Sequence, residues 1–304
     1  MTYWLKAPRR TRVIYDLIDS YLAQPRRSIR AAGRGAAKFM SRETHRLAIN
    51  YRKAIEEMCR RADAVVCATD EQRSDISRLC PNVHVILDIH EEFGDVSKAD
   101  YALNQPPRLV WEGLPYTLDA FRSLAPALRV LQRRHQFEMH LVTDPGYRQY
   151  ARRFIRRRTE DLAANLFESH VVHPWSVAEL RQTAISADLA LLPARLEDPF
   201  SAGKPENRLL IFWRLGVPTV AAATPAYSRA MKAAGLDLHY RTSQECVQQV
   251  EECLMDEGLR TRAAARGREF VLREHPTERR LEGWDEVLSS VGFGLSWDCG
   301  KRSD

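Results

Sequence analysis

The chain has 304 residues, of which 44% are hydrophobic, and a formal net charge of +6 at pH 7. This length and composition exclude a disordered protein and predict two domains of ordinary size with packed cores. The sequence has no run of about 18 apolar residues, and its opening residues lack the apolar core of a secretion signal. We therefore expect a cytoplasmic protein.

The cysteines indicate a reducing compartment. The six cysteines show neither Cys-x-x-Cys spacing nor the framework of a secreted protein (positions 59, 67, 80, 246, 253 and 299). We expect buried, reduced thiols and no metal centre.

Positive charge is concentrated near the N-terminus. Residues 1–62 hold 15 Lys and Arg against 5 Asp and Glu, and the remainder of the chain is net acidic. No helix-turn-helix, zinc or RNA-recognition pattern accompanies the basic runs Arg26–Arg30 and Arg152–Arg158, so we do not expect nucleic acid as a partner. For residues 20–62 we favour contact with an anionic membrane surface, and for residues 152–158 a solvated helix face.

The first part of the chain predicts a small α/β unit. A strand is expected over Thr11–Asp16, a basic helical region over 20–62, a strand over 63–68, a helix over 70–79 and a strand over 83–87. Within the basic region, apolar residues at helical spacing indicate a core-facing stripe (Phe39, Leu47, Tyr51, Ile55 and Met58). A sheet of only three parallel strands would leave an edge and one face exposed.

A second, larger unit begins after a segment rich in glycine, asparagine and proline at 94–107. Six strands alternate with helical stretches beyond it, near 108–112, 138–143, 168–172, 188–192, 218–222 and 237–240. This alternation predicts one complete, doubly wound parallel sheet. We therefore divide the chain into a partial N-terminal α/β domain (1–104), a Rossmann-type domain (105–290) and a frayed tail (291–304).

The segment Ala202–Ala221 predicts a helix that starts at an anion site and leads into a buried strand. Pro205 suits the first helical position, and Gly216 followed by Pro218 ends the helix. Lys204 and Arg208 flank the helix N-terminus, where free N–H groups and the helix dipole favour a diphosphate. The alternative is an ordinary solvated helix start.

The motifs Lys204-Pro-Glu-Asn-Arg-Leu-Leu and Phe212-Trp-Arg-Leu-Gly-Val-Pro-Thr-Val resemble the nucleotide-sugar segment of GT-B glycosyltransferases. The resemblance covers most of 105–290 and extends more thinly over 11–104. It implies a GT-B-like α/β fold and transfer of a sugar from a nucleotide-diphosphate sugar to a glycan or lipid-linked acceptor. It also implies a role in cell-surface polysaccharide synthesis, at the inner membrane, without a metal or other cofactor.

The sequence departs from this family at two acidic positions. The family glutamate five residues before the glycine is Ile211 here, and a second one is Lys204. The polar set left at this place comprises Lys204, Glu206, Asn207 and Arg208. Glu206 could accept a ribose or sugar hydroxyl, or it could be a first-turn glutamate that favours the helix dipole. The loss of both glutamates keeps open a second reading, a non-catalytic homologue that binds a nucleotide or glycan for another transferase.

Other candidate residues follow from the resemblance and from their place after predicted strands. Gly113 would let backbone approach the donor diphosphate, or it serves only a strand-to-helix turn. His173 and Trp175 lie where the family frames the nucleotide base, although proline and tryptophan in such a loop also serve packing.

On the opposite wall we expect Tyr15, Asp16 and Asp19, in a run that resembles a Tyr-Asp-x-x-Asp segment of related bacterial transferases. Asp19 could act as a base or orient an acceptor hydroxyl, or it could cap a helix. The first domain has about half the strands of a full GT-B N-terminal half. Either the chain begins at a late start site, or a partner subunit completes this domain.

Overall fold

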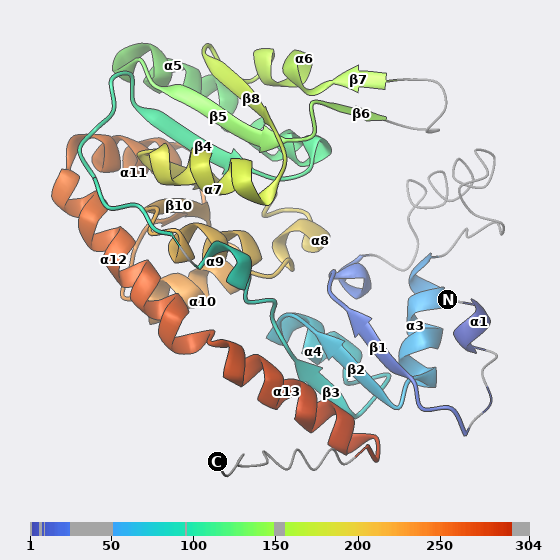
Figure 1. Cartoon of the computed structure of the whole chain (residues 1–304). Coiled ribbons are helices and arrows are strands. Elements are labelled where there is room, and N and C mark those ends of the chain that lie inside the picture. Colours follow the sequence, from blue (N-terminus) through green and yellow to red (C-terminus); the bar gives the residue numbers. More distant parts are fainter. Residues whose placement is uncertain are drawn as a thin grey trace, which may run out of the picture.

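The computed structural model describes residues 2–5, 8, 10–24, 51–94, 96–148 and 156–293. Within these residues the strands form two parallel sheets and one antiparallel hairpin (Figure 1). The first sheet has the order β1 (Ile14–Leu17), β2 (Ala64–Cys67), β3 (Val83–Val85). The larger sheet has the order β11 (His239–Tyr240), β10 (Thr219–Ala222), β9 (Leu189–Leu192), β4 (Arg108–Glu112), β5 (Glu138–Thr143), β8 (His170–Pro174).

The larger sheet is the doubly wound sheet that the sequence predicts. Its strands are parallel, and the chain leaves β4 in one direction to β5 and β8 and later reaches β9, β10 and β11 on the other side. The neighbours β4 and β9 therefore mark the point where the strand order reverses, which is where open α/β sheets bind ligands.

Helices cover both faces of this sheet. The connecting elements are η3 (Pro115–Phe121), α5 (Ala125–His135), α6 (Thr159–Ala164), α7 (Val177–Ser186), α8 (Pro199–Ala202), α9 (Asn207–Arg214), α10 (Pro225–Ala233) and α11 (Ser243–Met255). One hydrophobic cluster joins all of these elements except α8 to the strands and includes the fully buried Trp111, Phe121 and Trp213. This continuous core holds the carboxyl ends of the strands in fixed positions.

Helix α9 starts later than the sequence indicates. The helix runs over Asn207–Arg214 with Glu206 as the N-cap, so Pro205 precedes the helix and does not occupy its first position. Gly216 adopts a φ of +68° directly after the C-cap and ends the helix as expected. Five consecutive apolar residues, 209–213, are buried against the sheet and against α12 (Glu257–Glu274). This packing fixes the N-terminus of α9 at the edge of the sheet.

The first sheet is covered on both faces, so the expectation of an exposed face is wrong. On one face Leu17, Val65 and Cys67 pack with α3 (Tyr51–Arg61) and α4 (Asp70–Ile76). On the other face Ala64 and Val66 pack with α13 (Thr277–Ser290). The remaining elements here are α1 (Thr2–Leu5), η1 (Tyr21–Ala23) and η2 (Glu91–Phe93).

Helix α13 follows α12 and returns from the larger sheet to the first one, as Figure 1 shows. Asn82 donates a hydrogen bond to Ser290, and Arg280 pairs with Asp88 at 3.2 Å. These contacts join the C-terminal helix to the N-terminal part of the chain. No helix in the described part of the chain is long and apolar enough to cross a membrane.

Two expectations fall partly outside the described residues. Ile55 and Met58 of the predicted apolar stripe belong to α3 and are buried. Phe39 and Leu47 lie outside the described residues, and so do Arg26–Arg30 and most of 20–62. Of the second basic run, residues 156–158 are described, and they form strand β7 (Arg156–Arg158), paired with β6 (Gly146–Arg148). The predicted helix face is therefore wrong for this part.

Candidate functional site

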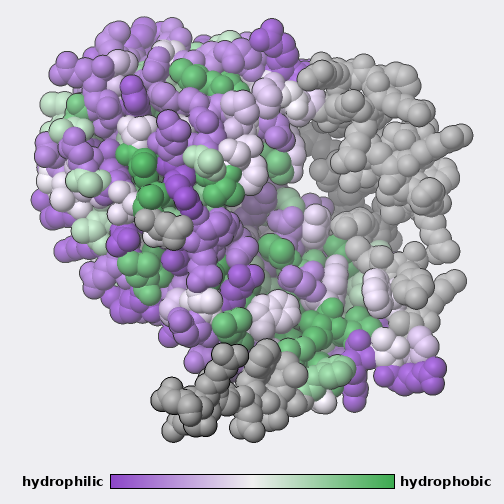
Figure 2. Space-filling model, in the orientation of Figure 1, coloured by the Kyte–Doolittle hydropathy of each residue, from purple (hydrophilic) through white to green (hydrophobic). Residues whose placement is uncertain are grey.

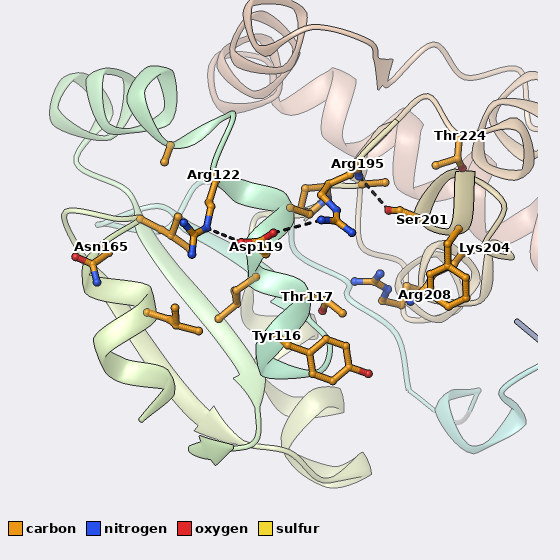
Figure 3. Close-up of a pocket in the computed structure, with 18 of the residues that line it drawn as sticks. Tyr116, Thr117, Asp119, Arg122, Asn165, Arg195, Ser201, Lys204, Arg208 and Thr224 are labelled. Carbon is orange, nitrogen blue, oxygen red and sulfur yellow. Dashed lines mark hydrogen bonds and ion pairs between the residues drawn. The ribbon is translucent and has the colours of Figure 1, made fainter. Parts of the chain in front are cut away.

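A cleft of about 1140 Å³ opens at the carboxyl ends of the central strands (Figure 3). Its walls come from η3 and α5, from the hairpin β6–β7 with α6, from the loop that follows β9, and from the starts of α9 and α10. Lys204 and Arg208 both line it. The two cations therefore lie where a doubly wound sheet binds its ligand, and the space before them is open.

Lys204 occupies the turn that leads into α9. Its Nζ lies 5.4 Å from the centre of the Phe200 ring. Burial lowers the pKa of Lys204, the charge of Arg208 lowers it further, and Asp19 and Asp198 act in the opposite direction. A diphosphate placed here would relieve this repulsion between two cations, because it brings the opposite charge.

Arg208 is held at the end of β4. Its Nη1 donates to the carbonyl oxygen of Glu112 at 3.1 Å, and its guanidinium also bonds to the Tyr227 hydroxyl. These contacts fix the guanidinium at the mouth of the cleft, and they leave further N–H donors for a ligand.

In the sequence, the N-cap of α9 lies between Lys204, in the preceding turn, and Arg208, in the first turn of the helix. Glu206 makes no side-chain hydrogen bond to the first turn of the helix. The first backbone N–H groups of a helix have no partner inside the helix. A cationic region that is rich in hydrogen-bond donors is thus formed by the N-terminus of α9, Lys204 and Arg208. We call this region the cationic place.

Glu206 and Asn207 carry buried polar atoms that find no hydrogen-bond partner among the described residues. These atoms are Oε2 of Glu206 and Oδ1 of Asn207. Burial raises the pKa of Glu206 from 4.5 to about 6. Buried polar atoms are normally paired, so each of these oxygens retains the capacity to accept a hydrogen bond, but neither residue lines the cleft.

Glu112 lies beside the predicted Gly113, although the sequence assigns it no role in the site. It ends β4 and is partly buried. Burial raises its pKa, while the charge of Arg208 and a hydrogen bond from the Trp175 side chain lower it. Its place at the carboxyl end of a buried strand, beside Gly113, is the sequence feature that indicates it.

Gly113 itself is required by packing. A Cβ atom there would lie 2.7 Å from Cζ2 of Trp111 and 3.0 Å from Oγ1 of Thr117. No side chain fits at this turn, so the backbone of Gly113 stays bare at the carboxyl edge of β4.

The two residues predicted to frame the nucleotide base, His173 and Trp175, lie in different surroundings in the structure. Trp175 is 48% exposed and its indole N–H reaches Glu112, so its ring lies beside the site. His173 instead lies between His140, at 3.0 Å, and Glu179, at 2.9 Å. Both ring nitrogens of His173 are therefore engaged by protein, and the residue does not line the cleft.

The loop after β1 meets the cleft from the other sheet. Asp19 acts electrostatically on Lys204 and on Tyr116, and Ser20 donates a hydrogen bond to the carbonyl of Gly203. The Tyr21 and Phe200 rings lie 5.3 Å apart. Asp19 does not itself line the cleft, but its charge acts on two residues that do, Lys204 and Tyr116.

Tyr15 and Asp16 do not line the cleft. Tyr15 packs against the apolar cluster around Leu17. Asp16 lies on the other side of β1, where burial raises its pKa and the charges of Arg280 and Asp88 also act on it. Successive residues of a strand point to opposite faces, so the two side chains could not both face the acceptor wall.

Comparisons with known proteins identify the fold. The chain resembles a structure of TarM from S. aureus in complex with fondaparinux, α-GlcNAc-glycerol and UDP, with 13% identity and a TM-score of 0.55 over 77% of this chain and 45% of that one. Sucrose-phosphate synthase from Thermosynechococcus elongatus gives 14% identity and a TM-score of 0.60, over 84% and 65% of the two chains.

Trehalose-6-phosphate synthase from E. coli, bound with UDP-2-fluoroglucose, gives 9% identity and a TM-score of 0.53, over 78% and 63%. This chain spans less than two thirds of each of these proteins. No curated protein matches the sequence. The family described as "Glycosyl transferase-like" matches residues 122–286, more than half of the chain. The chain therefore belongs to this glycosyltransferase family and has the GT-B fold.

Proposed function

We propose that this chain transfers a sugar from a nucleoside-diphosphate sugar to a glycan or lipid-linked acceptor. The observation that carries the proposal is the placement of Lys204, Arg208 and the N-terminus of α9 in one open cleft at the switch point of the sheet. Sugar transfer leaves negative charge on the departing diphosphate. Fixed cations and N–H groups aimed at that charge lower the barrier without needing to reorganise.

Around the diphosphate we assign the remaining donor contacts. The unpartnered oxygens of Glu206 and Asn207 accept hydroxyl groups of the ribose or of the sugar. The half-exposed ring of Trp175 borders the base, and the bare backbone at Gly113 lets the donor approach β4. His173, held by Glu179, supports the loop that carries Trp175.

On the acceptor side we assign Asp19 as the group that orients or deprotonates the acceptor hydroxyl. It approaches the cleft from the first sheet and acts on Lys204 at the donor side. A carboxylate beside both substrates is suited to accept the hydroxyl proton. Lys204 and Arg208 supply the charge that a metal ion would otherwise provide, and we propose that turnover needs no added metal.

We place this activity in the synthesis of a cell-surface polysaccharide at the inner membrane. The basic surplus of residues 1–62 supports contact with an anionic leaflet, since each basic residue near such a surface contributes about 1 kcal/mol. Dilution of anionic vesicles with neutral lipid should release the protein if this is right.

A second candidate function is a nucleotide-binding partner that does not catalyse. It is favoured by Ile211, which stands where related transferases carry a glutamate and is only 7% exposed within the core. This position supplies no polar group to a donor.

Turnover separates the two candidates. The isolated chain is incubated with UDP-, GDP- and ADP-sugars, first in a thermal-shift screen and then in an assay for release of the nucleoside diphosphate. We expect one nucleotide class to raise Tm and to be consumed when an acceptor is present. Binding without consumption would favour the non-catalytic partner, and no binding by any nucleotide would contradict both.

A further inference from the structure

The cleft extends well beyond the cationic place around Lys204 and Arg208. Its far part lies between η3, α5, α6 and the hairpin β6–β7, and we call this part the distal arm, with the lining residues Tyr116, Arg129, Tyr147, Arg157 and Asn165. Ligand pockets commonly enclose 300–1,000 Å³. The whole cleft, at about 1140 Å³, exceeds that range, so it has room for more than a donor.

The hairpin presents one selected face to the distal arm. Tyr147 on β6 and Arg157 on β7 are directly opposite each other in the antiparallel register. Cross-strand partners lie on the same face of a hairpin, and both residues line the cleft. Arg158, the next residue along β7, points to the other face and lines a separate depression with Gly146 and Glu160.

Charge is not evenly balanced along the cleft. In its middle, Asp119 pairs with Arg122 at 2.5 Å and with Arg195 at 3.5 Å (Figure 3). Asp198 also pairs with Arg195. These contacts neutralise the middle segment. The cleft therefore has two cationic ends separated by paired charges.

The cations of the distal arm lack carboxylate partners in the described part of the chain. Among the described residues, Arg129 donates to the backbone oxygens of Asn165, at 2.5 Å, and of Leu166, at 3.3 Å. These carbonyl groups are uncharged, so they do not neutralise the guanidinium. Arg157 makes no ion pair with any described carboxylate. Its charge acts on the Tyr147 hydroxyl, whose pKa is raised by burial and lowered by Arg157 and Arg122.

We propose that the distal arm binds an anionic group on the acceptor, which is accordingly an acidic glycan. This inference rests on the proposed function, because it assumes that the donor diphosphate occupies the Lys204 and Arg208 end. Arg157 and Arg129 hold a phosphate, carboxylate or sulfate on the glycan. Tyr116, which is 59% exposed, and Tyr147 offer ring faces against the apolar side of sugar rings.

An acidic glycan suits this arm better than a nucleic acid. The distal arm offers two uncompensated arginines and two tyrosines in a concave groove, not a basic stripe on an exposed helix or sheet. A glycan that carries one anionic group on every one or two sugars matches this low density of positive charge.

The test compares Arg157→Ala with Arg158→Ala in the full chain. The two variants remove the same charge from adjacent positions of one strand, and only Arg157 faces the cleft. Binding is measured by calorimetry at fixed ionic strength with a hyaluronan hexasaccharide, a sulfated heparin pentasaccharide, a poly(glycerol phosphate) oligomer and neutral maltohexaose. These probes distinguish a carboxylate, a sulfate and a phosphate as the source of the anion.

We expect at least one anionic probe to bind and maltohexaose not to. Arg157→Ala should weaken that binding about tenfold, since it removes hydrogen bonds to a charged group, and Arg158→Ala should change it less than twofold. Equal weakening by both variants, or binding of none of the anionic probes, would overturn the proposal. Equally tight, Arg157-dependent binding of single-stranded DNA of the same length would also overturn it, because the distal arm would then bind any anionic polymer and not glycans in particular.

Failure of this proposal is distinguishable from failure of the proposed function. UDP and GDP are titrated into the same preparations. Nucleotide binding that Arg157→Ala leaves unchanged, together with no binding of any acidic probe, would reject only the distal arm. Arg157-dependent binding of an acidic glycan, together with no nucleotide binding, would reject the proposed function and retain an acidic-glycan site.

Discussion

The two sheets of this protein differ in how they are stabilised. The six-stranded sheet has one continuous apolar cluster that fills both of its faces. The three-stranded sheet depends on two small clusters, one of which exists only because α13 returns to it. On the face seen in Figure 2, hydrophilic residues cover most of the larger unit and hydrophobic residues gather over β1 to β3. The candidate site is thus built mainly on the unit with the larger core, and the smaller one contributes through its loops.

Those loops make direct contacts across the cleft. Ser20 bonds to the carbonyl of Gly203, one residue before Lys204. Gln72 donates to Ser20 at 3.0 Å and to the carbonyl of Ile18 at 2.7 Å, which holds the β1 loop in place. The smaller sheet therefore positions the residue that we assign to the diphosphate.

The difference between the two cores can be tested with matched leucines. Leu191 of β9 is fully buried in the large cluster, and Leu17 of β1 is buried in a small one. Leu191→Ala should cost about 4 kcal/mol of unfolding free energy and Leu17→Ala about 2 kcal/mol, because a small cluster collapses more easily around a cavity. Urea denaturation measures both. An equal or reversed order would contradict the comparison.

The contact between the sheets can be broken at Gly203. A Cβ atom there would lie 2.6 Å from Oγ and 2.9 Å from Cβ of Ser20. Gly203→Ala should displace Lys204 and reduce nucleoside-diphosphate affinity about tenfold, with little loss of Tm.

Rescue by a second substitution provides the control for Gly203→Ala. Ser20→Gly removes the two atoms nearest to the new methyl group but leaves the Pro199 carbonyl oxygen at 3.1 Å and deletes the bond to Gly203, so the double variant should recover part of the affinity. No recovery in calorimetry would show that the loss arises elsewhere.

The pH dependence of stability sharpens the account of Glu206. Its pKa is about 6 when folded, against an ordinary value of 4.5, because burial disfavours the charged form. The folded state binds the proton more tightly, so its stability falls as pH rises from about 4.5 through about 6. Glu206→Gln removes this loss and should be about 1 kcal/mol more stable than the wild type at pH 8.

Denaturation at several pH values checks this prediction. The difference between Glu206→Gln and the wild type should shrink toward zero near pH 4, where the native carboxyl is protonated. A difference that stays constant across the range would mean that the charge of Glu206 is not the cause.

The smallest expected effect concerns a surface contact between α10 and α4. Arg229 donates hydrogen bonds to both carboxylate oxygens of Glu71. The side chains are 42% and 39% exposed, respectively. A double-mutant cycle with Arg229→Ala and Glu71→Ala should give about 0.5 kcal/mol of coupling. A coupling of several kcal/mol would mean that this exposed pair contributes far more to joining the two units than a surface ion pair normally does.

Much of the fold could be predicted from the sequence. The four inner strands of the large sheet, β4, β5, β9 and β10, have buried and mainly apolar centres, as a strand covered on both faces must have, whereas the edge strands β8 and β11 are less apolar. The spacing of Lys204 and Arg208 around a helix start predicts that they lie close together, and both line the cleft. The start of α9 was misplaced by two residues because Pro205 suits several positions near a helix start.

What the sequence could not show depends on tertiary contacts. The basic residues 156–158 were expected on a helix, but their pairing with 146–148 makes them a strand. His173 carries no local sign that His140 and Glu179 would engage its ring. The role of Glu112 depends on Trp175 and Arg208, which come from other strands and helices.

The central claim is that Lys204 and Arg208 hold a diphosphate, and calorimetry with UDP and GDP tests it most directly. The variant Lys204→Ala/Arg208→Ala is compared with Arg262→Ala/Arg266→Ala, which removes the same charge from the exposed surface of α12. We predict that the first variant loses at least about a hundredfold in affinity and the second less than twofold. Affinities of the two variants within threefold of each other would contradict the account.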